Sequence, residues 1–550
     1  MKKVDAMATT VTRLERTTTD TAATDALPEC ITRDRLTSPY FPSIRQSTLA
    51  VVASLAIVFF VTSLNRLNHT DLWAHVNFGR WIVDHGALPP FDPIVAHPSA
   101  TPVLQSAWLS QLLAYVTHQT LGNEGLILAH ALLVTLTALV MVLAVRARDP
   151  ESKLLWVVPL VVMTLNLPIV GTIRPQLFGQ LGAALVLLAA AQLMAGKKHP
   201  LFWLPIVSIC WANLHGSMLM GLVMLGAIAL GYTLQELAKN GWNLAAAAKA
   251  SGVAPLWIAA LLFVAFASIG PHGPMIWPHV IFFGESSALQ SISEWQRLPL
   301  KSLTCFLLVS SAVVAVAVSF KTPRPIAWYE ILLLALFALA TVMAIRMLAW
   351  WALVWPFAVV PHLSAIFSRS RATTPETTAT DDQPVAMRTV YAMAIVFVTL
   401  LVSPPSSSLL RGAPRGEARS TVTDTPVYLA DEVVRMNLQG NIAAPMDWGD
   451  YLLMRSDEKL RPLVATHVHL VSPDVWNDYQ TIFRGDKNWL AVARGRDMKY
   501  LAVSKNSYPQ LAREVLLADR EGRGRILYHD QRLILIELPA KAAPAATAAG

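Results

Sequence analysis

The sequence contains many long apolar segments, and these limit the possible fold more than any other feature. An α-helix rises 1.5 Å per residue, so a run of roughly 18 or more apolar residues can cross about 30 Å of hydrocarbon. Such runs recur up to about residue 403, which predicts a polytopic α-helical membrane protein with about eleven spans. We place the spans at about 46–64, 125–146, 153–170, 175–195, 200–214, 216–236, 253–270, 302–320, 326–345, 348–366 and 388–403.

The overall composition excludes an ordinary soluble protein. Hydrophobic residues make up 54% of the chain and charged residues only 15%, with a mean hydropathy of +0.45. The net charge of +8 is spread over short loops between the spans, so we interpret it as a topology signal and expect no nucleic-acid partner. Cys30, Cys210 and Cys305 are scattered, and two of them lie inside apolar runs, which indicates neither a disulfide framework nor a metal site.

Positive charge is concentrated in the N-terminal tail and in alternate loops. Because cytoplasmic loops carry an excess of Lys and Arg, this pattern places the N-terminus in the cytoplasm. We expect the tail 1–45 to be disordered, without a cleavable signal peptide. The residues that set this orientation are Lys2, Lys3, Arg13, Arg16, Arg33, Arg35 and Arg45, and then Arg146, Arg148, Lys153, Lys197, Lys198, Lys239, Lys249, Lys321, Arg324, Arg369, Arg371 and Arg388.

The unusual polar residues fall on the other, extracytoplasmic side. They are the outer loop from residue 65, Arg174 in the turn 172–175, the break 213–216, the loop 271–300, and Arg346 at a span end. Each arginine alone is equally consistent with a side chain that reaches from a span end to the interface. Because five such features coincide on one face, we expect an active site there.

The outer loop 65–124 is itself patterned. Apolar residues recur at helical spacing over 71–85, which predicts a short amphipathic helix that begins at Asp71 and ends near Gly86. A helix N-terminus favours a carboxylate, so capping is the structural alternative for Asp71. A second half-buried helix is expected at 107–120, ending at Leu121-Gly122.

Several motifs then follow in a characteristic order. After Asp71 come "G…LP…DP" (through Asp92), "LG-x-E-G", Arg174-Pro175-Gln176-Leu177-Phe178, Trp211-Ala212-Asn213-Leu214-His215-Gly216, Ile292-Ser293-Glu294-Trp295 and Arg346. This order resembles the C-type integral-membrane glycosyltransferases, the superfamily of protein O-mannosyltransferases and aminoarabinose transferases, and in particular a bacterial branch that is mostly uncharacterised. The match covers most of 46–366. It departs from the family where Leu72 replaces the second residue of an acidic pair, and where Gln105-Ser106-Ala107-Trp108 replaces a "PPL" motif.

The resemblance implies a sugar transfer from a polyprenyl-phosphate-linked donor to a lipid, glycan or protein acceptor on the extracytoplasmic face of a bacterial inner membrane. Asp71 would be the base that deprotonates the acceptor hydroxyl, with inversion at the anomeric carbon. Arg174, Arg346 and His215 are suited to the lipid phosphate, although His215 is equally consistent with a buried structural histidine. The further substrate-binding candidates are His75, Arg80, Asp92, Gln176, Asn213, Glu294 and Trp295.

Metal ligands are less well supported. His69, Asp71 and His75 match no compact metal-binding spacing, because a helix turns them to different faces. His467 and His469 are expected on a strand, with both imidazoles on one side. We therefore predict no cofactor and no tightly bound metal, with a divalent cation as the alternative because some relatives use one.

The rest of the chain predicts a second unit. Residues 367–387 read as a cytoplasmic linker, 388–403 as the last span, 404–424 as a spacer, 425–540 as a small extracytoplasmic α/β domain and 541–550 as a disordered tail. Expected strands lie at 441–446, 462–466, 499–504, 525–529 and 532–538, and helices at 426–437, 449–455, 472–482, 487–494 and 508–518. The segment 446–451 is expected to form a turn, more typical of structure than of ligand binding. We assign this domain to acceptor binding or scaffolding.

Three other functions remain open at this point. An outer-leaflet polysaccharide polymerase or ligase shares outer-face arginines and lipid-linked substrates. A lipid-linked glycan transporter would place charged features near the middle of the membrane and show repeat symmetry, and we find no convincing repeat. The third alternative is a non-catalytic membrane assembly protein.

Overall fold

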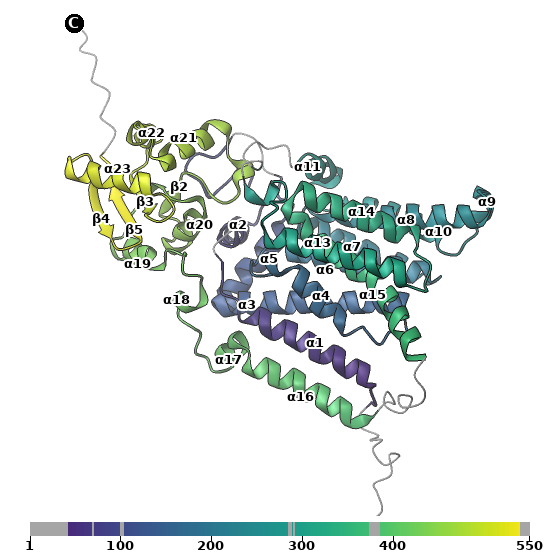
Figure 1. Ribbon diagram of the computed structural model, residues 1–550. Helices are drawn as coiled ribbons and strands as arrows, with labels where there is room; N and C mark the ends of the chain where they lie inside the picture. The colour runs from purple at the N-terminus through teal and green to yellow at the C-terminus, as the bar shows by residue number, and fades with distance from the viewer. Residues whose placement is uncertain are drawn as a thin grey trace, which may run out of the picture.

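A computed structural model describes residues 42–68, 71–99, 104–283, 289, 292–372 and 385–539. Within them the chain forms a bundle of long helices with a small α/β domain at one end (Figure 1). Of the tail 1–45 that was expected to be disordered, residues 42–45 are described, and Ile44 forms an antiparallel bridge with Val385. Residues 1–41, 541–550 and most of the linker 367–387 lie outside the described residues. Helix α15 continues to Ala372, which makes the first part of that linker helical.

Each predicted span corresponds to helix. The bundle contains α1 (Gln46–Ser63), α3 (Trp108–Arg148), α4 (Val157–Leu165), α5 (Leu167–Val170), α6 (Gln176–Met194), α7 (Pro200–Leu214), α8 (Met218–Lys239), α10 (Val253–Ala267), α13 (Leu303–Lys321), α14 (Trp328–Met343), α15 (Leu348–Ala372) and α16 (Ala386–Val402). Among the described helices, six are long and apolar enough to cross a membrane, or seven if the bent pair α16–α17 is one span. The predicted count of about eleven is therefore not confirmed, because α4, α7, α10 and α14 are shorter than a typical span.

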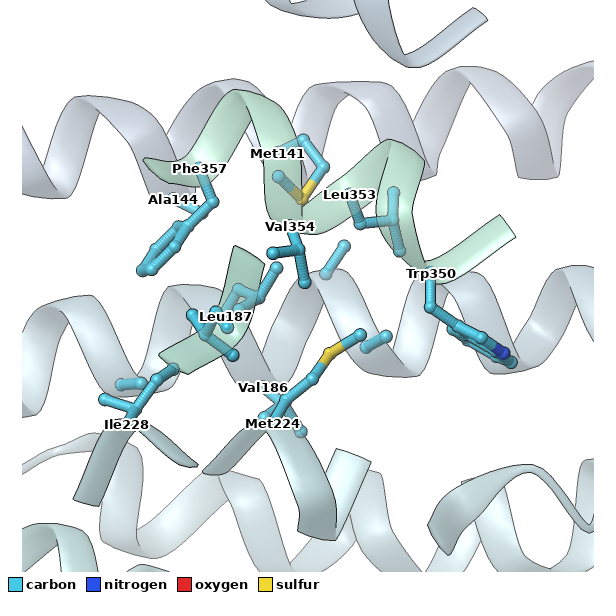
Figure 2. Close-up of a cluster of buried hydrophobic side chains, with 14 of the residues drawn as sticks. Met141, Ala144, Val186, Leu187, Met224, Ile228, Trp350, Leu353, Val354 and Phe357 are labelled. Atoms are coloured by element: carbon cyan, nitrogen blue, oxygen red, sulfur yellow. The ribbon is translucent and has the colours of Figure 1, made fainter. Parts of the chain in front are cut away.

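The bundle core joins helices from all parts of the membrane unit. Figure 2 shows Met141 of α3, Leu187 of α6, Met224 of α8 and Val354 of α15 converging in it. Small residues let the backbones approach: a Cβ added to Gly231 of α8 would lie 2.4 Å from the Cα of Tyr329 in α14. Close backbone packing of this kind holds helices together where the hydrophobic effect between them is weak.

The outer loop folds as the sequence predicted. Helix α2 (Leu72–His85) ends at Gly86, whose φ of 63° is left-handed and suits glycine. The second expected helix begins at Trp108 and continues into the next span as α3, with a break at Gly122 (φ 61°, ψ −156°). The bundle end that carries α2 is also the end that carries the C-terminal domain (Figure 1).

Residues 404–424 are folded rather than a simple spacer. They contain α17 (Pro404–Leu410) and α18 (Glu417–Ser420). Between these helices the Arg415 guanidinium donates to both carboxylate oxygens of buried Glu124, at 2.6 and 2.7 Å. Leu67 also forms an isolated parallel bridge with Thr421. The C-terminal domain is thus tied to the outer loop through its own connection.

The C-terminal domain has the predicted α/β character. Its elements are α19 (Val427–Arg435), β1 (Gly440–Ala443), α20 (Met446–Arg455), β2 (Leu460–Pro462), η6 (Val468–Leu470), α21 (Pro473–Arg484), α22 (Trp489–Gly495), β3 (Tyr500–Ser504), α23 (Pro509–Arg520), β4 (Arg525–His529) and β5 (Leu533–Glu537). The sheet has the order β2-β1-β3-β5-β4, with β1 parallel to β2 and β3, and β5 antiparallel to β3 and β4.

Two local predictions in this domain are wrong. The segment 446–451 is not a turn but the first half of α20. His467 and His469 are not on a strand, because β2 ends at Pro462 and the chain turns into the short 3-10 helix η6. The chain leaves the sheet at Thr466, whose backbone N–H and hydroxyl both donate to Oδ2 of the Asp450 carboxyl group.

Candidate functional site

Three charged side chains from distant parts of the chain meet at the bundle end next to the C-terminal domain. Nε of Arg174 lies 2.9 Å from Oδ1 of Asp71, and its Nη1 donates to Oε1 of Glu294. The three side chains are 18%, 28% and 38% exposed for Arg174, Asp71 and Glu294, so the row is reachable from outside. We call Asp71, Arg174 and Glu294 the ionic row.

Asp71 is held by this row and not by a helix cap. It stands at the N-cap position of α2 with helical backbone angles, and its side chain makes no capping hydrogen bond. Burial acts to raise the pKa of Asp71, but the charge of Arg174 and the neighbouring His75 outweigh it and hold the pKa well below its ordinary value. Asp71 is therefore ionised, and its side chain is oriented by charge.

Arg174 stands in the turn between α5 and α6. Pro175 follows it as the N-cap of α6, so the turn directs the arginine away from the helix axis at the end of the bundle. Burial acts to lower the pKa of the guanidinium, but Asp71 and Glu294 raise it, so Arg174 remains charged. The arginine already satisfies two carboxylates, and a phosphate would have to compete with them.

Glu294 and Arg346 are brought together by two short 3-10 helices, η4 (Ser293–Trp295) and η5 (Ile345–Met347). The backbone N–H of Ile345 donates to the carbonyl of Gln296 at 3.2 Å, which joins the two segments. The guanidinium carbon of Arg346 lies 4.4 Å from the centre of the Trp295 ring, a cation–π distance. Among the described residues no carboxylate oxygen lies within 4.0 Å of Arg346, so Arg346 is the less neutralised arginine of the site.

His215 faces the same charges. Asp71, Arg174 and Arg346 all influence it electrostatically. The backbone N–H of Ser217 donates to Nδ1 of His215 at 3.1 Å, so a neutral His215 carries its proton on Nε2. The imidazole can then donate a hydrogen bond, which is compatible with either role expected for it.

Three other predicted residues, Gln176, His75 and Asn213, lie in the helices at this end of the bundle. Gln176 is buried at the start of α6, and His75 places Nε2 3.9 Å from Oδ2 of Asp71. Asn213 is committed to structure: it accepts from Trp108 at 2.8 Å and donates to the carbonyls of Ile209 and Ile269.

Arg80 and Asp92 lie away from the ionic row. Arg80 pairs with Asp457 of the C-terminal domain at 2.8 Å. Asp92 is buried and accepts from the Ile94 N–H at 2.9 Å, and burial raises its pKa to about 6. Helical spacing could not show that Arg80 lies away from the ionic row. Helix α2 packs between the bundle and the C-terminal domain, and Arg80 faces the domain.

Sequence reasoning assigned the C-terminal domain to acceptor binding or scaffolding but named none of its residues at the site. The ring of His467 lies 4.9 Å from the ring of His75, and Asn77 donates to the backbone carbonyl of Asp450 at 2.8 Å. His467 and Asp450 are both buried. The paired histidines were noticed in the sequence, but the assumed strand gave no reason to bring them to Asp71.

An apolar cavity of about 280 Å³ opens beside Arg174. Its walls come mainly from α3, and the lining residues Leu132 and Leu136 of that helix are exposed on the outside of the bundle. The cavity therefore joins the ionic row to the surface that lipid chains would cover. Its lining includes Leu72, His75, Leu126, Leu133, Arg174 and Phe178.

Within the described ranges, no group of three or more His, Cys, Asp or Glu side chains is arranged to hold a metal ion. His69 is outside these ranges. That the protein has no tightly bound metal, with a divalent cation as the alternative, stays a prediction.

No family model and no curated protein sequence matches the chain. The fold is similar to crystal structures of the oligosaccharyltransferase of Archaeoglobus fulgidus. Its apo form has a TM-score of 0.56 at 13% identity, over 91% of this chain and 75% of that one. The complex of this protein, AglB, with an inhibitory peptide and a dolichol-phosphate has a TM-score of 0.53 at 12% identity, over 90% and 75%.

ArnT from Cupriavidus metallidurans bound to undecaprenyl phosphate also matches, with a TM-score of 0.46 at 13% identity over 90% of this chain and 99% of that one. The likeness to AglB supports the resemblance drawn from the order of motifs. The chain has the fold of the C-type integral-membrane glycosyltransferases.

Proposed function

We propose that the protein transfers a sugar from a polyprenyl-phosphate-linked donor to an acceptor hydroxyl at the extracytoplasmic face of a bacterial inner membrane. The observation that carries the proposal is the ionic row beside the apolar cavity. Together with Arg346, they supply what such a transfer requires: the carboxylate of Asp71, the two guanidinium groups of Arg174 and Arg346, and an apolar cavity for the lipid. AglB, which shares the fold, has been captured with a dolichol-phosphate.

Asp71 is the proposed base. A hydroxyl is a poor nucleophile, so a carboxylate that removes its proton as the sugar–phosphate bond breaks speeds the reaction. Asp71 is ionised, partly exposed and fixed by Arg174 at 2.9 Å, which is the state that a base requires. A single displacement of this kind inverts the configuration at the anomeric carbon.

Arg346 and Arg174 are the proposed phosphate ligands. The leaving lipid phosphate gains negative charge as the bond breaks, and preorganised guanidinium groups stabilise that charge. Arg346, with only the Trp295 face and no close carboxylate among the described residues, offers the first contact. Arg174 then exchanges part of its pairing with Asp71 and Glu294 for a phosphate oxygen. The apolar cavity beside Arg174 accommodates the first units of the lipid chain.

Binding of undecaprenyl phosphate to the purified protein in lipid nanodiscs tests the phosphate site. Arg346→Ala should weaken binding about tenfold or more, the scale of one charge-assisted hydrogen bond. Arg66→Ala is the control for general charge, because Arg66 is an exposed arginine in the outer loop 65–124. Equal affinity of the wild type and the Arg346 variant would reject the phosphate site. An equal loss in both variants would show only general attraction of the anion.

The face of the membrane is tested separately. Tyr428 is exposed on the C-terminal domain and Lys249 is exposed at the other end of the bundle. In a background without native cysteines, a membrane-impermeant thiol reagent applied to intact cells should label Tyr428→Cys and not Lys249→Cys. The reverse pattern would place the ionic row in the cytoplasm and overturn the proposed topology.

A further inference from the structure

Five aromatic side chains continue the site from Asp71 into the C-terminal domain and back to Arg346. The ring of His75 contacts that of His467 in a tilted arrangement with ring centres 4.9 Å apart, and His467 lies 5.6 Å from His469. The ring of Phe283 is 4.9 Å from His469 and 5.9 Å from Trp295, on which Arg346 rests. We call His75, His467, His469, Phe283 and Trp295 the aromatic wall.

The aromatic wall and the ionic row meet at both ends, so together they surround one region. At one end His75 is 3.9 Å from Asp71, and at the other Trp295 is the chain neighbour of Glu294. The wall therefore faces the same reacting region as the row, from the side of the C-terminal domain. His469, Phe283 and Trp295 are only half-buried and so present ring surface to a ligand.

Two nitrogen atoms of the wall lack hydrogen-bond partners among the described residues. They are Nδ1 of His75 and Nδ1 of His467, in side chains that are more than nine-tenths buried. Buried polar atoms without partners are rare in folded proteins, because each costs free energy comparable to a lost hydrogen bond. Two such atoms on neighbouring rings beside a reactive carboxylate indicate a site completed by a ligand.

We propose that the aromatic wall is the acceptor side of the transfer site, and that it selects an uncharged carbohydrate acceptor to which His467 forms a hydrogen bond through Nδ1. This inference rests on the proposed function. Flat rings contact the apolar C–H faces of sugars, while a few buried polar atoms fix the orientation of the ligand.

The charges of the region disfavour an anionic acceptor. Burial, together with the charges of neighbouring histidines, lowers the pKa of His467 well below its usual value, and burial lowers that of His469 to about 3. Both imidazoles are therefore neutral at physiological pH. The cations beside the wall are Arg174 and Arg346, and under the proposed function both bind the donor phosphate. A phosphorylated acceptor would bring a charge that nothing along the wall neutralises.

Substitutions at His467 test the hydrogen bond. An Asn side chain places its amide near the position of Nδ1, whereas Gln reaches toward Nε2. With undecaprenyl phosphate bound, His467→Ala and His467→Gln should bind a short alkyl glycoside about tenfold more weakly than the wild type, and His467→Asn should retain most of the affinity. His529→Ala, an exposed histidine on β4, is the matched control. Thermal unfolding of each variant checks that the domain remains folded.

The same measurement separates the two proposals. We expect the 6-phosphate of the glycoside and a Ser/Thr peptide each to bind at least tenfold more weakly than the neutral glycoside. Unchanged glycoside affinity in folded His467→Ala, or equal affinity for the phosphorylated glycoside or the peptide, would overturn the acceptor inference while lipid-phosphate binding stands. If the wild type does not bind lipid phosphate, the proposed function is wrong, and the acceptor inference fails with it.

Discussion

Replacing Asp71 by Asn separates its proposed chemical role from its structural one. The amide keeps the shape of the side chain but removes its charge and its basicity. Loss of one positioned base lowers rates about 10²–10⁴-fold, so sugar transfer should fall by that factor. The ion pair with Arg174 is partly exposed, with 28% of the Asp71 side chain accessible, so its loss should cost at most about 1 kcal/mol of stability.

The same substitution should not weaken lipid-phosphate binding. Arg174 loses one of its two carboxylates and becomes more available to an anion. A fall in rate with equal or tighter binding of undecaprenyl phosphate is therefore the expected signature. A helix cap would behave differently, because Asn caps about as well as Asp and would leave both quantities unchanged.

The assay is release of lipid phosphate from a lipid-phosphate sugar donor by the purified protein in nanodiscs, with thermal unfolding recorded alongside. Asp84→Asn on the same helix is the matched control, because Asp84 is exposed and pairs only weakly with Arg80 at 3.4 Å. Near-normal transfer by Asp71→Asn would refute the reasoning, and Asp92 or Glu294 would be the next carboxylates to test.

Two further predictions concern stability. In the membrane unit, Arg148 pairs with Glu330 in a nearly inaccessible site. Breaking a buried ion pair costs about 3–5 kcal/mol, so Glu330→Gln should markedly lower the thermal unfolding temperature. An unchanged unfolding temperature would contradict this. In the C-terminal domain, burial raises the pKa of Asp450 to about 8. The folded state therefore keeps a proton on Asp450 that the unfolded state loses near pH 4. The free energy of unfolding should fall as the pH rises from about 4 to about 8. Asp450→Asn keeps the acceptor for Thr466 and should flatten that decline in a series of thermal unfolding measurements, whereas an identical pH dependence would locate the effect in another group.

The helices and their order could be predicted because apolar runs report directly on burial in a hydrocarbon environment. The number of crossings could not, since helices such as α7 and α10 are apolar but short, and their neighbours bury much of them. The α/β character of the C-terminal domain followed from alternating patterns. His467 was misplaced because the contact between Asp450 and Thr466, which turns the chain away from the sheet, joins residues that no local pattern links.

The ionic row was predictable only as a list of residues on one face. Loop charge predicts one common side of the membrane for Asp71, Arg174, Glu294 and Arg346, and this prediction grouped them. Their pairing did not follow, because Arg174 is 103 residues from Asp71 and its partners depend on how α2 and η4 fold back over the bundle end. For the same reason Arg80, which shares a helix with His75, was assigned to the site although it faces Asp457.

The pairing of Asp71 with Arg174 also implies an order of events under the proposed function. In the free protein Arg174 keeps the pKa of Asp71 low, which makes the carboxylate a weak base. A donor phosphate that engages Arg174 shares its charge, so the pKa of Asp71 rises and the base strengthens when the donor is in place. The acid limb of kcat/KM reports the free protein and that of kcat the complex, so the limb of kcat should lie at higher pH. Coincident limbs would show that Arg174 holds Asp71 equally in both states, and donor binding would then not activate the base.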